Sequence, residues 1–201
     1  EMGVAQNTLV WFMSDNGGLP RLDPPTTGGL RSYKGSMYEG GLRVPAIIEW
    51  PNGISKVRIT KYPAGAVDIF PTIAEVAGLK KTDLLKPQDG MSLAKLFLKE
   101  PGPRQKPLPF RSRGRIAVVD NDYKMISFPD SGKTRYELYN LANDMSEQDN
   151  LFKKEPKIAN QLRKKLKAID ASVTASVNGQ DYPEKKVAPQ PPRIFWWERE
   201  S

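Results

Sequence analysis

The sequence predicts an α/β fold followed by a small α+β unit. The first observation is a short apolar run rich in strand-forming residues, Thr8–Met13, which stops at the polar, glycine-rich segment 14–18. The second is the order of the elements, because strands and helices come first, and three short strands and a long amphipathic helix follow. We therefore expect a main α/β domain over residues 1–100, a small antiparallel sheet with a covering helix over 101–178, and a proline-rich tail with an aromatic end over 179–201.

Two strands and a long loop open the main domain. Because Thr8–Met13 is continuously apolar after its first residue, we expect a strand that a complete sheet would bury on both faces. In this chain we expect one edge or face of that strand to lie open. Residues 14–44 carry three glycine pairs and almost no periodicity, and a loop of that length inside a domain is usually functional. The run VPAIIEW over residues 44–50 predicts the next strand.

Helix signals and then a linker follow. Asp68–Ala77 is predicted as a helix, with Asp68 as its cap and Gly78 at its end. Ser92–Leu98 is predicted as a shorter helix. Residues 100–114 are rich in proline and arginine, which indicates a linker between the two units.

The second unit has a hairpin signal and a helix signal. Arg115–Val119 and Tyr123–Phe128 flank a polar turn, and Arg135–Tyr139 predicts a third strand. After Pro156, apolar residues recur at helical spacing on an otherwise lysine-rich segment: Ile158, Leu162, Leu166 and Ile169. We therefore expect an amphipathic helix that covers a small sheet.

Composition excludes several kinds of chemistry. The 201 residues include no cysteine and no histidine, so disulfides, thiolate metal sites, the usual zinc and copper sites and a histidine base are excluded. No apolar stretch is long enough to span a membrane, and the first residues do not form a secretory signal. The net charge of +8 favours anionic partners such as sulfated or phosphorylated molecules.

Three polar residues of the long loop are candidates for a site. Asp15 and Asn16 follow the first strand directly, and together they can offer a carboxylate and an amide oxygen to one hard cation. Lys34 lies in a glycine-containing segment, where a fixed ammonium group suits sulfate or phosphate. The alternative is that Asp15 and Asn16 serve the turn alone and that Lys34 is a solvated loop residue.

Taken together, several ordered segments resemble the C-terminal half of type I sulfatases, the arylsulfatase family. The resemblance covers roughly residues 8–152 in the order of the family. It rests on Ser14-Asp15-Asn16-Gly17-Gly18, Lys34-Gly35, YEGGLRVP over 38–45, Trp50-Pro51, VDIFPTIAEVAG over 67–78, Tyr123-Lys124, ELYNL over 137–141, Asp144, Glu147 and Asn150-Leu151.

This resemblance implies an alkaline-phosphatase-like fold and the hydrolysis of aryl sulfates or sulfated carbohydrates, including sulfated polysaccharides. It implies that Asp15 and Asn16 are ligands of one Ca²⁺, that Asp15 lies near a hydrated formylglycine nucleophile, and that Lys34 binds the substrate sulfate. It also implies a periplasmic, secreted or lysosomal location, although the chain carries no targeting signal.

The sequence departs from the family in one respect that matters for activity. It contains no Cys/Ser-x-Pro/Ala-x-Arg motif, from which the family makes formylglycine. We therefore expect the nucleophile and the other calcium ligands to come from a missing N-terminal half, and the isolated chain to be inactive.

Two other functions remain open. A non-catalytic basic module could bind sulfated glycan or nucleic acid, but the aromatic residues lie mostly in predicted strands, so nucleic acid is not expected. A fragment of a related phosphatase or phosphodiesterase would carry histidine in the place of Asn16.

For the remaining polar and aromatic residues we expect structural roles. Glu39 and Arg43 are expected to pair with each other. The lysines at 153, 154, 164, 165 and 167 are expected to form a solvated face, and Trp196-Trp197 to dock on the body.

Overall fold

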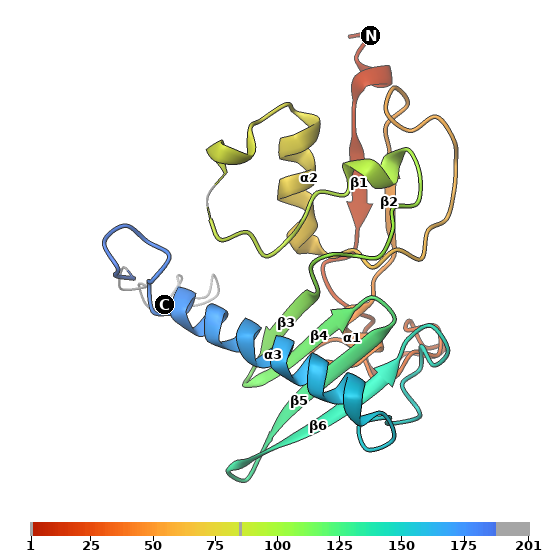
Figure 1. Cartoon of the computed structure of the whole chain (residues 1–201). Helices are drawn as coiled ribbons and strands as arrows, with labels where there is room; N and C mark the ends of the chain where they lie inside the picture. Colours follow the sequence, from red (N-terminus) through yellow and green to blue (C-terminus); the bar gives the residue numbers. More distant parts are fainter. Residues whose placement is uncertain (1, 85, 188–201) are drawn as a thin grey trace, which may run out of the picture.

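An N-terminal strand pair and a C-terminal sheet organise the chain in the computed structural model, which describes residues 2–84 and 86–187 (Figure 1). β1 (Val10–Met13) and β2 (Ala46–Glu49) pair antiparallel, with Val10 opposite Glu49. The segment between them forms only one short helix, α1 (Glu39–Leu42). The expected long loop between the first two strands is therefore confirmed.

The first strand is apolar on both sides, and one of its faces lies open in the described residues, as expected from the sequence of this chain. Val10 is 50% exposed and Phe12 is 69% exposed, whereas Trp11 and Met13 on the opposite face are half-buried. β1 has β2 as its only strand neighbour in the part of the chain that the structure describes. One face of this pair therefore presents apolar side chains to solvent.

Both predicted helices of the main domain are present, but their bounds or their helix type differ from the prediction. α2 (Ile69–Val76) follows a 3₁₀ turn at Ala66–Asp68, close to the predicted start. The predicted helix over Ser92–Leu98 is a shorter 3₁₀ turn, Ala94–Phe97, before which the Ser92 hydroxyl accepts a hydrogen bond from the Ala94 amide. Further short 3₁₀ turns lie at Ala5–Asn7 and Lys81–Asp83.

The C-terminal sheet is an antiparallel meander in which each strand pairs with the next. Its strands are β3 (Leu108–Ser112), β4 (Arg115–Asp120), β5 (Tyr123–Asp130) and β6 (Lys133–Asn140). The three predicted strands are confirmed. β3 corrects the prediction of a linker over 100–114, because an edge strand tolerates Pro109, which has no amide hydrogen to donate to a further strand.

The sheet is covered on both faces. α3 (Pro156–Val177) covers one face, where its buried side chains meet alternate residues of the strands (Figure 1). The other face contacts residues 37–42 of the long loop: Ala117, Val119, Ile126 and Tyr139 pack with Met37. Both halves of this small core follow from the strand period of two, which sends neighbouring side chains to opposite faces. The sheet therefore separates α3 from the loop.

Three remaining predictions concern membrane spans, the C-terminal tail and the domain boundaries. Within the described ranges, no helix has the length and apolar character required to cross a bilayer. Trp196-Trp197 and most of the tail over 179–201 lie outside the described residues. The domain boundaries at 100/101 and 178/179 stay predictions.

Candidate functional site

The loop that follows β1 carries the predicted cation ligands. Its first residue is anchored to the second strand region, since the Ser14 amide donates to the Pro45 carbonyl (3.4 Å) and the Ser14 hydroxyl donates to the Asn16 carbonyl (2.9 Å). Asp15 is exposed and Asn16 is half-buried. This leaves the Asp15 carboxylate available to a ligand from outside the chain.

Glycines allow this loop to lie directly against residues 31–41. A Cβ at Gly17 would stand 2.1 Å from the Gly40 carbonyl oxygen, and a Cβ at Gly40 would stand 2.2 Å from the Ser32 carbonyl oxygen. No side chain fits at such separations, so the two segments touch through their backbones. The Gly17 amide donates to the Gly41 carbonyl (3.2 Å), which fixes the two segments to each other.

Lys34 is held beside this loop through its own backbone. Its amide donates to the Gly18 carbonyl at 2.9 Å, and its side chain is exposed. The structure therefore brings the segment of Lys34 against the segment of Asp15 and Asn16, although nineteen residues separate Lys34 from Asp15 in the sequence. The Lys34 ammonium group forms no ion pair with a described residue.

An open depression of about 690 Å³ lies beside the loop. Glycines of the loop line part of it, and its polar lining comes from Ser14, Asn16, Thr26, Thr27 and Arg43. Asp15 and Lys34 do not line it. Of the three predicted site residues, Asn16 is therefore the one that faces this depression.

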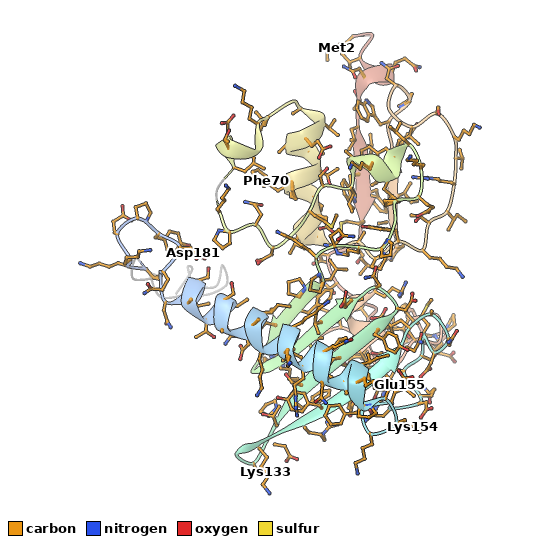
Figure 2. The ribbon with its side chains drawn as sticks, in the orientation of Figure 1. Met2, Phe70, Lys133, Lys154, Glu155 and Asp181 are labelled. Atoms are coloured by element: carbon orange, nitrogen blue, oxygen red, sulfur yellow. The ribbon has the colours of Figure 1, made fainter. Side chains whose placement is uncertain are left out.

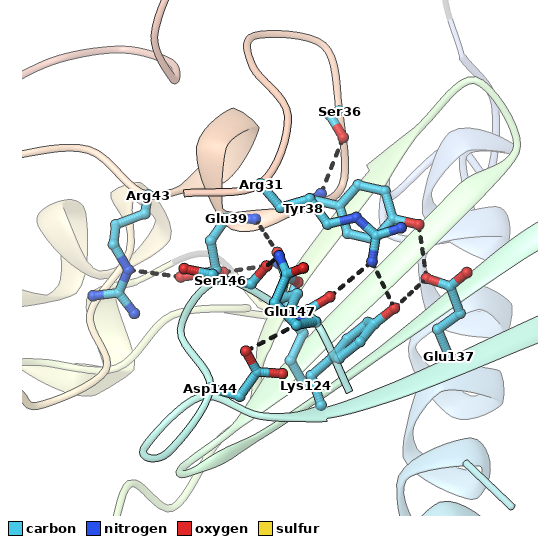
Figure 3. A network of polar contacts seen from close by, with 12 residues as sticks. Arg31, Ser36, Tyr38, Glu39, Arg43, Lys124, Glu137, Asp144, Ser146 and Glu147 are labelled. Carbon is cyan, nitrogen blue, oxygen red and sulfur yellow. Dashed lines mark hydrogen bonds and ion pairs between the residues drawn. The ribbon is translucent and has the colours of Figure 1, made fainter. Parts of the chain in front are cut away.

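Arg31 ties the segment that carries Lys34 to the C-terminal sheet (Figure 3). One Arg31 Nη donates to the Tyr139 hydroxyl (3.0 Å) and to the Glu147 carbonyl (2.8 Å), while the guanidinium lies 3.8 Å from the centre of the Tyr38 ring. The hydroxyls of Tyr38 and Tyr139 both donate to the Glu137 carboxylate (2.7 and 2.8 Å). These contacts hold the loop at both sides of Lys34.

The pKa values in this cluster follow from the same contacts. Burial alone would raise the pKa of the Glu137 carboxyl, but the hydrogen bonds from the two tyrosines and from Arg135 lower it. Burial and the nearby Glu137 carboxylate raise the pKa of Tyr139 and of Tyr38. Both tyrosines therefore remain protonated donors near neutral pH.

A second polar cluster is buried beneath the loop and contains Glu39, Lys124 and Glu147. The Lys124 ammonium group lies 2.8 Å from Glu39 Oε1 and 2.9 Å from Glu147 Oε1, and the Lys124 and Glu147 side chains are fully buried. The other oxygen of Glu147 accepts from the Glu39 amide (2.6 Å), and the other oxygen of Glu39 accepts from Arg43 Nε (2.7 Å). The expected pairing of Glu39 with Arg43 is therefore confirmed.

The two carboxyl groups of this cluster respond differently to burial. For Glu39, burial raises the pKa, but Lys124 and Arg43 outweigh this effect and the pKa is lowered. For Glu147, burial outweighs the attraction of Lys124, and the pKa is raised. The Lys124 ammonium group thus pairs with two buried carboxylates, and it compensates the negative charge of Glu147 only in part.

Sequence reasoning missed most of this support. Lys124 and Glu147 come from segments far from Glu39, and Arg31 was not recognised as a clamp. One signal was present, because Lys124 stands in a strand beside Met125 and Ile126, where a charged side chain requires a partner. Asp68 was predicted as a cap; its carboxylate does accept from the Gly65 amide (2.9 Å), and it also forms a fully buried ion pair with Arg104.

The donor set tests whether this chain could hold Ca²⁺. Carboxylate and amide oxygens are the ligands that Ca²⁺ prefers, so Asp15 and Asn16 fit in kind. Ca²⁺ takes about six to eight oxygen ligands. Among the described residues no group of three or more acidic, histidine or cysteine side chains could hold a metal ion. Asp15 and Asn16 therefore fit a Ca²⁺ site whose remaining ligands would come from outside the described residues.

The lysines that the sequence places on a solvated face are exposed, whereas their binding to a polyanion is untested. The lysines at 153, 154, 164, 165 and 167 are all exposed. Lys154 pairs with Asp149 (2.6 Å) and Lys165 pairs with Asp120, so part of this charge is neutralised locally.

Comparison with known proteins gives consistent results. Residues 32–172 match the family model described as N-sulphoglucosamine sulphohydrolase, C-terminal. A sulfatase of Formosa agariphila is 34% identical over 169 residues, which are 77% of this chain and 30% of that protein. Human arylsulfatase A is 36% identical over 134 residues, which are 62% of this chain and 25% of that protein. The chain thus spans less than a third of the length of these two relatives.

A solved structure agrees with these sequence matches. The crystal structure of the PsFucS1 sulfatase from a Pseudoalteromonas species superposes with a TM-score of 0.67 at 23% identity, and covers 90% of this chain and 39% of that one. A likeness at this level of identity establishes the fold. The predicted alkaline-phosphatase-like α/β fold with a small C-terminal α+β subdomain is confirmed.

Proposed function

Since the chain belongs to the type I sulfatase family, we propose that it forms the part of a sulfate ester hydrolase that supplies two calcium ligands and a sulfate-binding lysine. The hydrolase class follows from the family, whereas the individual residue roles are the proposal. The observation that supports them is the hydrogen bond from the Lys34 amide to the Gly18 carbonyl, which holds Lys34 beside Asp15 and Asn16.

The chain's own residues would act on the sulfate group by charge and by position. The exposed Lys34 ammonium group, mounted on a clamped loop, would bind a sulfuryl oxygen of the substrate. Asp15 and Asn16 would each give an oxygen to Ca²⁺, and when bound that ion neutralises charge on the sulfuryl oxygens. Arg31, with its contacts to the C-terminal sheet, would keep Lys34 in place while the ester bond breaks.

The nucleophile would come from another part of the enzyme. The family uses formylglycine, and this sequence has neither a cysteine nor the serine motif from which it is made. We therefore expect the chain on its own to leave an aryl sulfate unhydrolysed and to bind Ca²⁺ weakly. The substrate class is a sulfate ester of an aryl alcohol or a carbohydrate, and the location is periplasmic, secreted or lysosomal.

The test combines this chain with the residues that supply formylglycine, either as the complete enzyme or as complementing fragments. Lys34→Ala should lower kcat/KM for an aryl sulfate by about 10²–10³, the usual cost of one preorganised charge contact. Lys56→Ala, which removes an exposed lysine of another loop, is the matched control and should leave kcat/KM unchanged. Equal activity of the two variants would remove Lys34 from the site.

A further inference from the structure

The segment that leads into α3, together with α3 itself, concentrates the positive charge of the chain. Residues 151–177 contain seven basic residues and two acidic ones, so this stretch carries a net +5 of the total +8. The basic residues are Lys153, Lys154, Lys157, Arg163, Lys164, Lys165 and Lys167. The two acidic residues are engaged elsewhere, because Asp170 pairs with Arg111 of β3 and Glu155 interacts with Tyr123. Both acidic residues thus have their partners on the C-terminal sheet and not among the lysines of α3.

Three of these lysines form one face, which we call the basic face: Lys157, Lys164 and Lys167. They lie opposite the buried side of the helix, which is formed by Ala159, Leu162 and Leu166. None of the three lysines has an ion pair or a hydrogen bond with a residue in the described ranges 2–84 and 86–187. Their charges are therefore available to a partner.

The placement of these charges is unfavourable for an isolated helix. Lys157 lies in the first turn, where the positive end of the helix dipole disfavours a cation. Lys164 and Lys167 are three residues apart, a spacing at which like charges repel. A bound polyanion would remove both costs.

We infer that the basic face binds the chain of a linear sulfated polysaccharide. Exposed amides of Asn160 and Gln161 lie between the lysines on the same face, where they can bond to sugar hydroxyls. The face carries no aromatic side chain on which the bases of a single-stranded nucleic acid could stack. The choice of sulfate as the anionic group rests on the proposed function.

This surface is distinct from the proposed sulfate site. α3 covers one face of the C-terminal sheet, and the loop that carries Lys34 packs on the other (Figure 2). A polymer bound along α3 is therefore not bound at Lys34. The role of the basic face is to hold a long substrate near the enzyme and so to raise the local concentration of sulfate esters.

The experiment measures binding of the whole chain to heparin by isothermal titration over a series of salt concentrations. The test variant is Lys157→Gln/Lys164→Gln/Lys167→Gln, in which glutamine keeps the helix propensity. The control variant is Lys56→Gln/Arg58→Gln/Lys61→Gln, which removes the same charge from an exposed loop. The test variant should bind heparin about tenfold more weakly, with a shallower salt dependence, while the control stays within about twofold.

Two further ligands define what would overturn the inference. Desulfated heparin should bind at least about tenfold more weakly than heparin, because sulfate carries most of the recognised charge. The inference fails if both triple variants lose affinity equally, since binding then follows net charge alone. It also fails if a DNA duplex binds as tightly as heparin and is weakened equally by the test variant. Neither outcome involves hydrolysis, so failure here leaves the test of Lys34 unaffected.

Discussion

Replacing Lys124 by methionine removes the single cation that two buried carboxylates share. The change keeps an unbranched side chain that is one heavy atom shorter, but it leaves Glu39 with Arg43 alone and Glu147 with no cation. Breaking a buried ion pair in this way typically costs about 3–5 kcal/mol. Because the Lys124 and Glu147 side chains are fully buried, we expect a loss in this range near neutral pH.

The same substitution predicts a pH dependence whose sign is fixed by burial. Without Lys124, burial raises the pKa of the Glu147 carboxyl further above the unfolded value of about 4.3, because no other cation contacts it, whereas Glu39 keeps Arg43. A carboxyl with a raised folded pKa binds its proton more tightly in the native state, so its destabilising effect is absent below the unfolded pKa and develops as pH rises through the folded pKa. The stability deficit of Lys124→Met should therefore shrink as the solution is acidified.

Urea unfolding followed by circular dichroism checks this expectation, at about pH 7.5 and about pH 5.5. Lys165→Met is the control, because Lys165 is half exposed and its pair with Asp120 contributes at most about 1 kcal/mol. In the native protein the lowered pKa of Glu39 and the raised pKa of Glu147 have opposite effects on how the free energy of unfolding changes with pH. The stability of the unsubstituted protein should therefore vary less with pH than either shift alone would cause. A deficit of equal size at both pH values would refute the buried-charge explanation.

Two other substitutions probe the support of the site. Gly17→Ala should destabilise the chain by at least about 1–3 kcal/mol, because its Cβ would stand 2.1 Å from the Gly40 carbonyl oxygen. Gly102→Ala has open space and should be neutral in the same thermal melts; equal losses would contradict the close-contact argument. Asp68→Asn should cost about 3–5 kcal/mol by leaving Arg104 buried without a counter-charge. A loss below about 1 kcal/mol, the size expected of an exposed pair, would show that water reaches the guanidinium.

Elements governed by local periodicity could be predicted from the sequence. The hairpin of β4 and β5 has short runs of strand-forming apolar residues on both sides of a polar turn, and α3 has apolar residues at helical spacing after Pro156. Both signals concern neighbours in the sequence. β3 escaped prediction because Pro109 disfavours a strand in general, and only its edge position makes it acceptable there.

The candidate site was predictable only in its exposed residues. Asp15, Asn16 and Lys34 could be named from motifs, and the structure brings their segments together through backbone hydrogen bonds. Their roles in calcium and sulfate binding stay predictions. The supporting contacts of Lys124 and Glu147 are set by tertiary packing between distant segments, and no local pattern records which carboxylate a buried lysine will meet.

The contacts between residues 14–18 and 31–41 also bear on how this region can change in evolution. Its architecture depends on glycines such as Gly17 and Gly40, where any added side chain would collide with a backbone. Its proposed chemistry depends on Asp15 and Lys34, whose side chains are exposed and support no described neighbour. Architecture and chemistry are thus encoded by different residues of one short stretch. A single substitution at Asp15 or Lys34 can therefore abolish or redirect activity while the fold persists, so well-folded pseudoenzymes are within easy mutational reach.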